Sequence, residues 1–127
     1  MYPTDRRYSK EHEWIRVDDR VGVIGITDFA QDQLGDIVFV ELPEEGKAVR
    51  AGDVLGTIES VKAVSEIFSP VSGRVSAANS ELDLRPELLN ADPHGEGWYC
   101  KIELDDPEQL DRLMDAGGYE EFAQQGS

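Results

Sequence analysis

Lys62 lies in the segment ESVKAVSEIFSPVSG (residues 59–73), which otherwise carries the β-branched residues and turn signals of two strands. Lysine is depleted from strands and costly to bury, so an isolated lysine there is ordinarily a solvated residue at a sheet edge. Strand-like runs on both sides converge here on SVKA, which predicts an amine that protrudes at a tight hairpin tip. Val61 and Ala63 leave access to the amine, and Glu59 offers a carboxylate for recognition. An enzyme that acylates this amine would convert the ammonium into a neutral amide and lengthen its reach.

The other reactive side chains form no pattern typical of catalysis or metal binding. His12 and His94 are far apart and accompany no cysteine cluster, so we expect a surface or loop position for the first and a turn for the second. The sequence contains no GxSxG, and its glycines form neither GxxxxGK[ST] nor GxGxxG. Cys100 lies in the strand-like run WYCKIEL, which favours an inert buried thiol. We therefore expect no metal site, and a protein that is not an enzyme.

Length and charge narrow the class of protein further. The 127 residues fit one domain over residues 1–127, with flexible ends at 1–7 and 124–127. The 27 acidic and 12 basic residues give a formal charge of −15, which repels phosphate backbones and anionic lipids. We therefore expect a monomer that binds neither nucleic acid nor membranes.

Cysteine content and the start of the chain predict where the protein works. A single cysteine cannot form an internal disulfide, as is typical of proteins from reducing compartments. The start, MYPTDRRYSKEHEW, has no apolar segment and carries acidic residues, so neither a signal peptide nor a transit peptide is expected. This favours a cytoplasmic protein or a mature organellar one, and of these we expect a cytoplasmic protein.

Short β-branched or aromatic runs, separated by turn residues, recur about every ten residues along the chain. This spacing predicts a mainly β protein, an antiparallel sandwich or barrel with a few peripheral helices. Strands are expected at 13–17, 21–26, 36–42, on both sides of the turn 51–53, at 63–69, at 74–79 and at 98–104.

Capping residues predict the helices. Thr27 is the expected N-cap of a two-turn helix that ends at Gly35. Asp106 is expected to cap a second helix, with Gln109 in the capping-box position and the pair Gly117–Gly118 at its end. A final short helix is expected after these glycines.

Several segments resemble the H-protein family of the glycine cleavage system: YSKEHEWIRV, VIGITDFAQDQLGDIVFVELPEEG, ESVKAVSEIFSPVSG, NADPHGEGW and DPEQLDRLMDAGGYEEF. The resemblance runs from about Tyr8 to about Ala123, nearly the whole chain. In this family the lysine of ESVKA carries lipoic acid in amide linkage, and Lys62 occupies that place. The resemblance implies a small antiparallel β sandwich, the barrel-sandwich hybrid of lipoyl and biotinyl domains, with short peripheral helices and a C-terminal helical segment.

The resemblance also implies the function of a lipoyl-bearing shuttle. A pyridoxal-phosphate glycine decarboxylase would pass an aminomethyl group to the lipoyl arm on Lys62. An aminomethyltransferase would move the one-carbon unit to tetrahydrofolate, and dihydrolipoamide dehydrogenase would reoxidise the dithiol. A lipoate ligase or lipoyltransferase would attach the lipoate, and the tether would present the arm to each enzyme at high effective concentration.

The resemblance implies further site residues around the arm. Recognition of the hairpin is expected from Glu59, Ser60, Val61 and Ala63. Family members fold the loaded arm away from water beside the N-terminal strand and the lysine hairpin, where it can pair with a carboxylate. The corresponding arm-cleft residues here are Glu11, Glu13, Gln33 and Glu66. Plain solvation of a charged surface is the competing explanation for these carboxylates, particularly for Glu11.

Three other readings of the sequence compete with the shuttle. Lipoyl or biotinyl domains of other multienzyme complexes resemble the central part, but they usually show DKA or MKM at the lysine and lack the helical flanks. A relay that passes lipoyl groups to other proteins is compatible with the same residues. A hydrolase or transferase has only scattered carboxylates in its favour.

Overall fold

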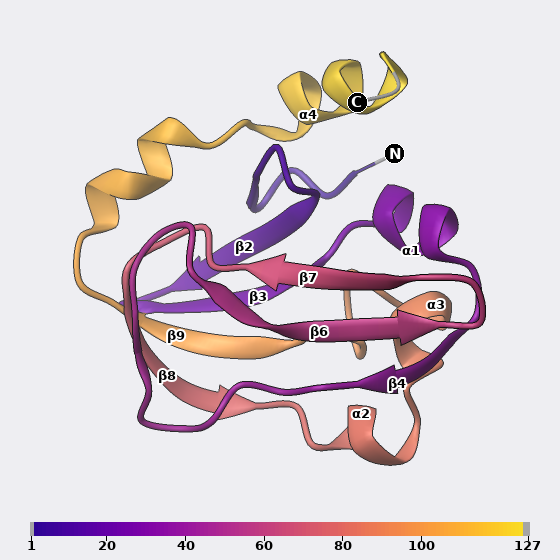
Figure 1. Cartoon of the computed structure of the whole chain (residues 1–127). Helices are drawn as coiled ribbons and strands as arrows, with labels where there is room; N and C mark the ends of the chain where they lie inside the picture. The colour runs from indigo at the N-terminus through magenta and orange to yellow at the C-terminus, as the bar shows by residue number, and fades with distance from the viewer. Residues whose placement is uncertain (1, 126–127) are drawn as a thin grey trace.

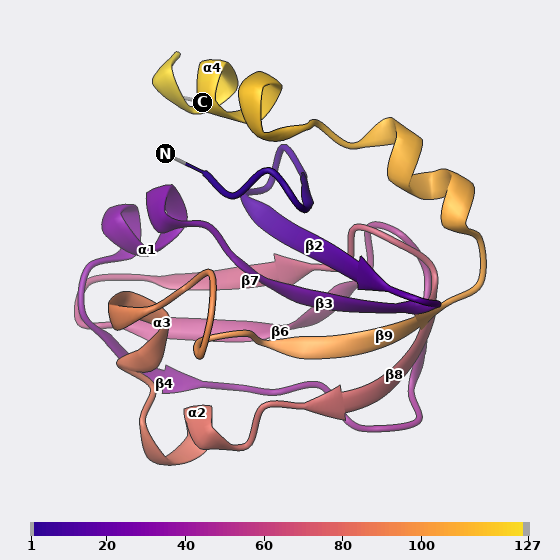
Figure 2. The same ribbon diagram turned by 180° about the vertical axis from the view of Figure 1, so that it is seen from behind.

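The computed structural model describes residues 2–125 and shows two antiparallel sheets packed face to face (Figures 1 and 2). The six-stranded sheet has the order β1 (Arg7–Tyr8), β2 (Glu13–Asp18), β3 (Val21–Ile26), β9 (Cys100–Leu104), β8 (Gly73–Ala78) and β5 (Ala48–Val49). The three-stranded sheet has the order β4 (Ile37–Val40), β6 (Val54–Ser60) and β7 (Val64–Phe68). The predicted antiparallel β sandwich is confirmed.

Short helices surround the sheets, as the sequence predicts (Figure 1). They are α1 (Asp28–Leu34), α2 (Glu81–Leu84), α3 (Leu88–Ala91), the 3₁₀ helix η1 (Pro107–Arg112) and α4 (Ala116–Gln124). Within residues 2–125, no helix is long and apolar enough to cross a bilayer.

Alternating side chains build the core between the sheets. Along β9, Cys100, Ile102 and Leu104 are buried, and the residues between them face outward. Ile58 of β6 is 1% exposed and packs into the same core from the other sheet. The predicted burial of the Cys100 thiol is confirmed, and this burial raises its pKa to about 12.

The helix α1 begins and ends at the predicted residues. Thr27 has an extended backbone, and its hydroxyl accepts a hydrogen bond from the backbone N–H of Ala30 at 3.2 Å. Gly35 ends the helix with φ 77° and ψ −155°, a backbone conformation that essentially only glycine adopts, and its N–H donates to the carbonyl of Gln31.

The C-terminal segment differs from the prediction in two respects. The helix after Asp106 is 3₁₀ and stops at Arg112, and Gln109 does not form a capping box, because its side-chain amide bonds Ser72 on another segment. The pair Gly117–Gly118 does not end this helix but lies in the first turn of α4, since Asp115 caps α4 by accepting from the N–H of Gly118 at 2.8 Å. A tertiary contact and a better N-cap override the local pattern.

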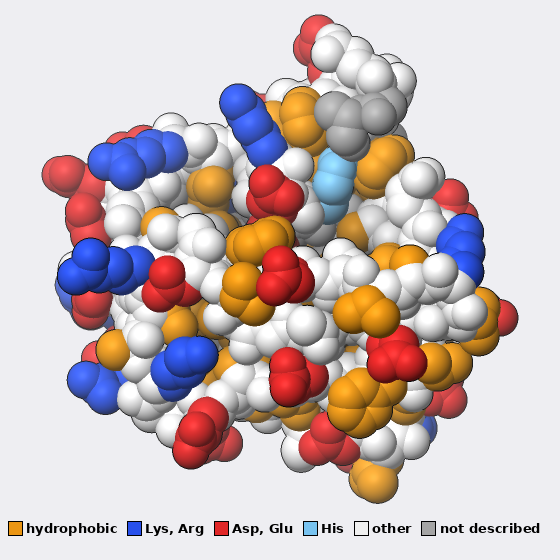
Figure 3. All heavy atoms as spheres, in the orientation of Figure 1, with side chains coloured by type: hydrophobic (Ala, Val, Ile, Leu, Met, Phe, Trp, Pro, Cys, Tyr) orange, Lys and Arg blue, Asp and Glu red, His pale blue; other side chains and the backbone are white. Residues whose placement is uncertain are grey.

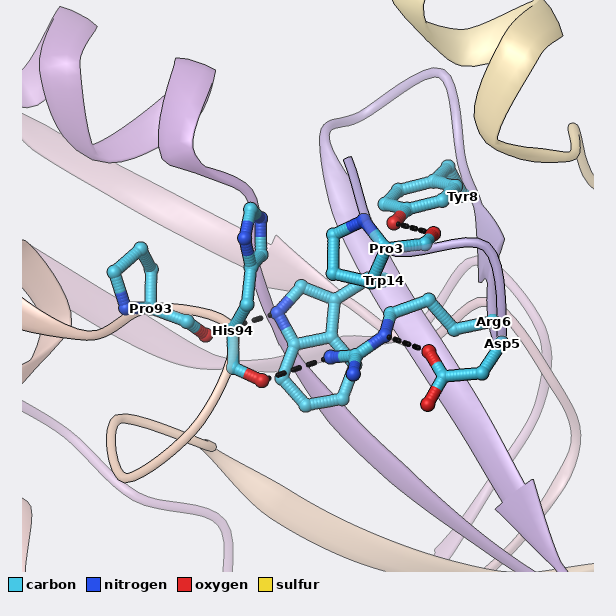
Figure 4. A network of polar contacts seen from close by, with 7 residues as sticks. All are labelled: Pro3, Asp5, Arg6, Tyr8, Trp14, Pro93 and His94. Carbon is cyan, nitrogen blue, oxygen red and sulfur yellow. Dashed lines mark hydrogen bonds and ion pairs between the residues drawn. The ribbon is translucent and has the colours of Figure 1, made fainter. Parts of the chain in front are cut away.

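The N-terminal segment is tied to the loop before β9 (Figure 4). The Arg6 guanidinium lies 4.5 Å from the ring centre of Trp14 and donates to the carbonyl of His94 at 2.8 Å. The indole N–H of Trp14 donates to the carbonyl of Pro93 at 3.0 Å. Residues 1, 126 and 127 of the predicted flexible ends lie outside the described residues. Arg6 belongs to the same predicted flexible segment, but its side chain is only 6% exposed and is held by these contacts.

The buried carboxyl of Glu13 joins the two sheets. It is 2% exposed and accepts hydrogen bonds from the Ser9 hydroxyl at 2.5 Å and from the backbone N–H of Phe68 in β7 at 3.1 Å. Because burial penalises the charged form, the pKa of the Glu13 carboxyl rises to about 7 in spite of these two donors. The contact between β2 and β7 therefore contains a group that changes its charge near neutral pH.

We expect Glu13 to make the chain less stable as pH rises. Its folded pKa of about 7 lies above the ordinary value of 4.5, so the folded state holds a proton that the unfolded chain has released. The stabilisation is complete below pH 4.5 and is lost as the pH rises to about 7. At about 1.4 kcal/mol per pKa unit, the loss is on the order of 3 kcal/mol.

Urea unfolding of Glu13→Gln and the parent at about pH 5 and pH 8 measures this effect. The glutamine side chain can accept from Phe68 and donate to Ser9, so the variant should lack this part of the pH dependence. Glu66→Gln removes an exposed carboxyl and should keep the parent's profile. A Glu13→Gln variant with the parent's pH dependence would contradict the assignment.

Candidate functional site

Lys62 stands at the tip of the β6–β7 hairpin. Val61, Lys62 and Ala63 connect the two strands, and all are exposed. Ser60 shapes the turn from inside: its N–H donates to the carbonyl of Ala63 at 2.8 Å, and its hydroxyl accepts from the N–H of Ala63 at 3.0 Å and from that of Lys62 at 3.3 Å. The amine therefore projects from a hydrogen-bonded turn into solvent, as the sequence predicts.

The segment between α1 and β4 supports this tip. The carbonyl of Asp36 accepts the N–H of Val61 at 2.9 Å, which connects the hairpin to a second chain segment. The aliphatic stem of Lys62 runs along Gly35: a Cβ at Gly35 would lie 3.3 Å from Cε of Lys62 and 3.8 Å from Nζ. The missing side chain of Gly35 thus provides the space in which the lysine stem lies.

Asn90 of α3 holds this supporting segment from the other side. Its side-chain amide donates to the carbonyl of Gly35 and to Oε1 of Gln31, each at 2.9 Å. Its carbonyl oxygen accepts the N–H of Ile37 at 2.9 Å. Asn90 therefore fixes both ends of the segment to which the lysine hairpin is attached, although it lies far from Lys62 in the sequence.

A cleft of about 370 Å³ lies beside the hairpin, between the loop before β2, the helix α1 and the strand β7. Its walls are Glu11, His12, Phe29, Ala30, Gln33, Leu34 and Ser65. Leu34 immediately precedes Gly35, beside which the lysine stem runs. Ser65 is the second residue of β7 and so lies close to Lys62 in the hairpin. The cleft combines apolar and polar walls, which suits a hydrocarbon chain with a polar end.

The helix α4 supports one wall of this cleft. The Tyr119 hydroxyl lies 2.7 Å from Nδ1 of His12 and 2.7 Å from Oγ1 of Thr27. The His12 ring lies against Phe29, with the ring centres 4.7 Å apart. His12 has φ 70°, in the left-handed region that few non-glycine residues adopt. This backbone turn and the Tyr119 contact hold the imidazole at the cleft wall.

The predicted arm-cleft residues are only partly brought together. Glu11 and Gln33 line the cleft. Glu13 lies behind the wall, where its carboxyl binds Ser9 and Phe68. Glu66 is exposed and pairs with Thr57 of β6, whereas its neighbour Ser65 faces the cleft. Because successive side chains of a strand point to opposite faces, Glu66 lies on the other side of the sheet.

Several residues of the site were not predicted from the sequence. Phe29, Ala30 and Leu34 share one face of α1 with the predicted Gln33, a grouping that the spacing within the predicted helix could have indicated. Asn90 and Tyr119 carry no such signal, since tertiary contacts alone bring them to the site. Within the described residues, no group of three or more His, Cys, Asp or Glu side chains could hold a metal ion.

We expect Gly35→Ala to destabilise the chain by about 1–3 kcal/mol, because alanine does not tolerate the backbone conformation of Gly35. The new Cβ would also meet the lysine stem. Urea unfolding measures the change, with Gly117→Ala as the control, because a Cβ at Gly117 meets only Asp115 Oδ1 at 3.8 Å. The control should be neutral or more stable; equal stability of both variants would contradict the role of Gly35.

Comparison with known proteins shows the family of this chain. A family model described as glycine cleavage H-protein matches residues 6–126. The glycine cleavage system H protein of Symbiobacterium thermophilum is 54% identical over 124 residues, covering 98% of this chain and 97% of that protein. The H protein of Thermotoga maritima is 48% identical over 120 residues, covering 94% and 97%.

A solved structure gives the same result for the fold. The crystal structure of a glycine cleavage system H protein from Mycobacterium marinum superposes with a TM-score of 0.87 at 36% identity, and 98% of each chain is covered. The fold class and the family resemblance predicted from the sequence are thereby confirmed. This chain belongs to the glycine cleavage H-protein family.

Proposed function

We propose that Lys62 carries lipoate in amide linkage, and that the chain uses this arm as the carrier of the glycine cleavage system. Membership of the H-protein family supports the carrier role. The observation that carries the assignment to Lys62 is its position: an exposed amine at the tip of a braced hairpin, directly beside a cleft of about 370 Å³.

The surroundings of Lys62 suit the attachment of an acyl group. When the amide forms, the nitrogen attacks an activated lipoyl carbonyl, the leaving group departs from that carbon, and a proton leaves the nitrogen. The reacting nitrogen must therefore enter the active site of a lipoate ligase or lipoyltransferase. An exposed tip whose backbone is held by Ser60 and Asp36 can enter such a site without unfolding.

The bound dithiolane would supply the chemistry of the shuttle, accepting the aminomethyl group from a pyridoxal-phosphate glycine decarboxylase, delivering it to an aminomethyltransferase and being reoxidised by dihydrolipoamide dehydrogenase. The chain itself contributes the tether, which raises the effective concentration of the arm at each partner. This division of labour supports the expectation that the chain is a carrier and not itself an enzyme. The cytoplasmic location expected from the sequence stays a prediction.

The cleft would shield the far end of the arm from water. The apolar side chains of Phe29, Ala30 and Leu34 suit the hydrocarbon part of the arm, and Glu11 and Gln33 offer polar partners for its end. Glu13 supports the wall through Ser9 and Phe68. Of the four predicted arm-cleft residues, Glu66 has the least support for a role at the arm, because its side chain lies on the opposite face of β7.

The first test of this function is the modification itself. Co-expression with a lipoate ligase should add one lipoyl group to the parent chain, and Lys62→Arg should abolish the addition, because a guanidinium is not acylated. Lys47→Arg removes another exposed lysine and should be modified like the parent. Intact-mass spectrometry measures both variants. A lipoyl group that persists in Lys62→Arg would refute the assignment.

The second test locates the arm on the surface. Backbone amide NMR spectra of the bare and the lipoylated chain should differ at Glu11, Gln33 and Ser65, because the arm would lie against these residues. The amide signal of Leu84, remote on α2, should stay unchanged and serves as the control. Shifts restricted to the hairpin tip would show that the arm does not enter the cleft.

A further inference from the structure

Exposed hydrophobic side chains gather around Lys62. Six large hydrophobic residues are exposed in the part of the chain that the structure describes, and four of them belong to the sheet end that carries the lysine. These are Val38 (50% exposed), Phe39 (56%), Val61 (68%) and Val64 (67%). Such a grouping on a chain of charge −15 is typical of an interaction surface.

Strand register places Phe39 and Val64 on the outer face of the three-stranded sheet, and Val38 and Val61 are their exposed neighbours in sequence or at the hairpin tip. Phe39 pairs with Glu59, and Glu59 pairs with Val64, so the three side chains form one row across β4, β6 and β7. The adjacent row, with Val40 and Ile58, points into the core. Figure 3 shows hydrophobic side chains interspersed with acidic ones over this face, with basic side chains towards its periphery.

In the part of the chain that the structure describes, the carboxylates on this face form no salt bridge. Two of them, those of Glu59 and Glu66, are exposed. A third exposed carboxylate, that of Glu41, lies nearby and accepts a hydrogen bond from the hydroxyl of Thr57 at 3.5 Å. A complementary surface would be apolar at its centre and bordered by arginine or lysine side chains.

We propose that this lysine-flanking face, formed by Val38, Phe39, Glu59, Val61 and Val64, docks the enzyme that attaches lipoate to Lys62, through an apolar surface with a basic border. The proposal rests on the function proposed above. The attaching enzyme must bring its activated carbonyl to Nζ itself, so it must contact the immediate surroundings of the lysine. Enzymes that act on the far end of the arm have no such requirement.

Phe39 is the expected anchor, because a large aromatic side chain near the centre of an interface commonly carries much of the binding energy. Phe39→Ser should raise the KM of a purified lipoate ligase for the bare chain about tenfold, with kcat within about twofold. The same variant should weaken direct binding of the bare chain to the ligase about tenfold, measured by calorimetry.

The matched control is Val54→Thr, because Val54 is 37% exposed at the start of β6, at the end of the β6–β7 hairpin away from Lys62. This variant should keep the parent's KM and affinity. Glu59→Lys should weaken binding and reduce its dependence on salt, since it reverses a charge beside the basic border. Val64→Thr, which suits an exposed strand position, repeats the test if Phe39→Ser does not fold.

The outcomes separate the two proposals. If the parent chain accepts no lipoate at Lys62, the proposed function fails. If the parent is lipoylated there, but Phe39→Ser and Val64→Thr keep its KM and affinity, the docking face is refuted and the function stands. A fall in kcat at unchanged KM and affinity would also refute docking.

Discussion

The hydrogen bond between the N–H of Val61 and the carbonyl of Asp36 is the contact on which the site depends. A two-stranded hairpin is only marginally stable by itself, and its tip would otherwise be free to move. This bond connects the tip to the segment between α1 and β4, and Asn90 fixes both ends of that segment. The lysine stem then lies beside Gly35, whose backbone conformation only glycine adopts readily. A mobile side chain thus begins from a fixed position.

Lys62 lies between two surfaces of different character. On the side of α1, Ser65 faces a cleft with mixed apolar and polar walls. On the outer face of the sheet, Val64 belongs to an exposed apolar row interrupted by Glu59. The alternation of side chains along β7 separates these surfaces, because adjacent residues point to opposite faces. The chain can therefore offer the bare amine to one partner surface and still keep a separate place for the arm.

The sequence could predict most of the fold and the position of the amine. Thr27 and Gly35 delimit α1 through local capping, and the strands follow from short alternating runs with turns between them. The prediction failed after Asp106, where Gln109 binds Ser72 and the glycine pair belongs to the next helix. Local patterns cannot reveal a partner on a distant segment, and a glycine pair can lie in the first turn of a helix as well as after its last.

By itself the sequence determined that this chain is a small acidic β protein with one lysine at a hairpin tip, because strand periodicity, turn residues and charge are local properties. Only the tertiary structure decided which residues surround that lysine. The tertiary structure buried Glu13 between the sheets and moved its pKa to about 7, and it separated Glu66 from Glu11 and Gln33. Burial and strand face depend on the packing of segments far apart in the chain, so no local pattern contains them.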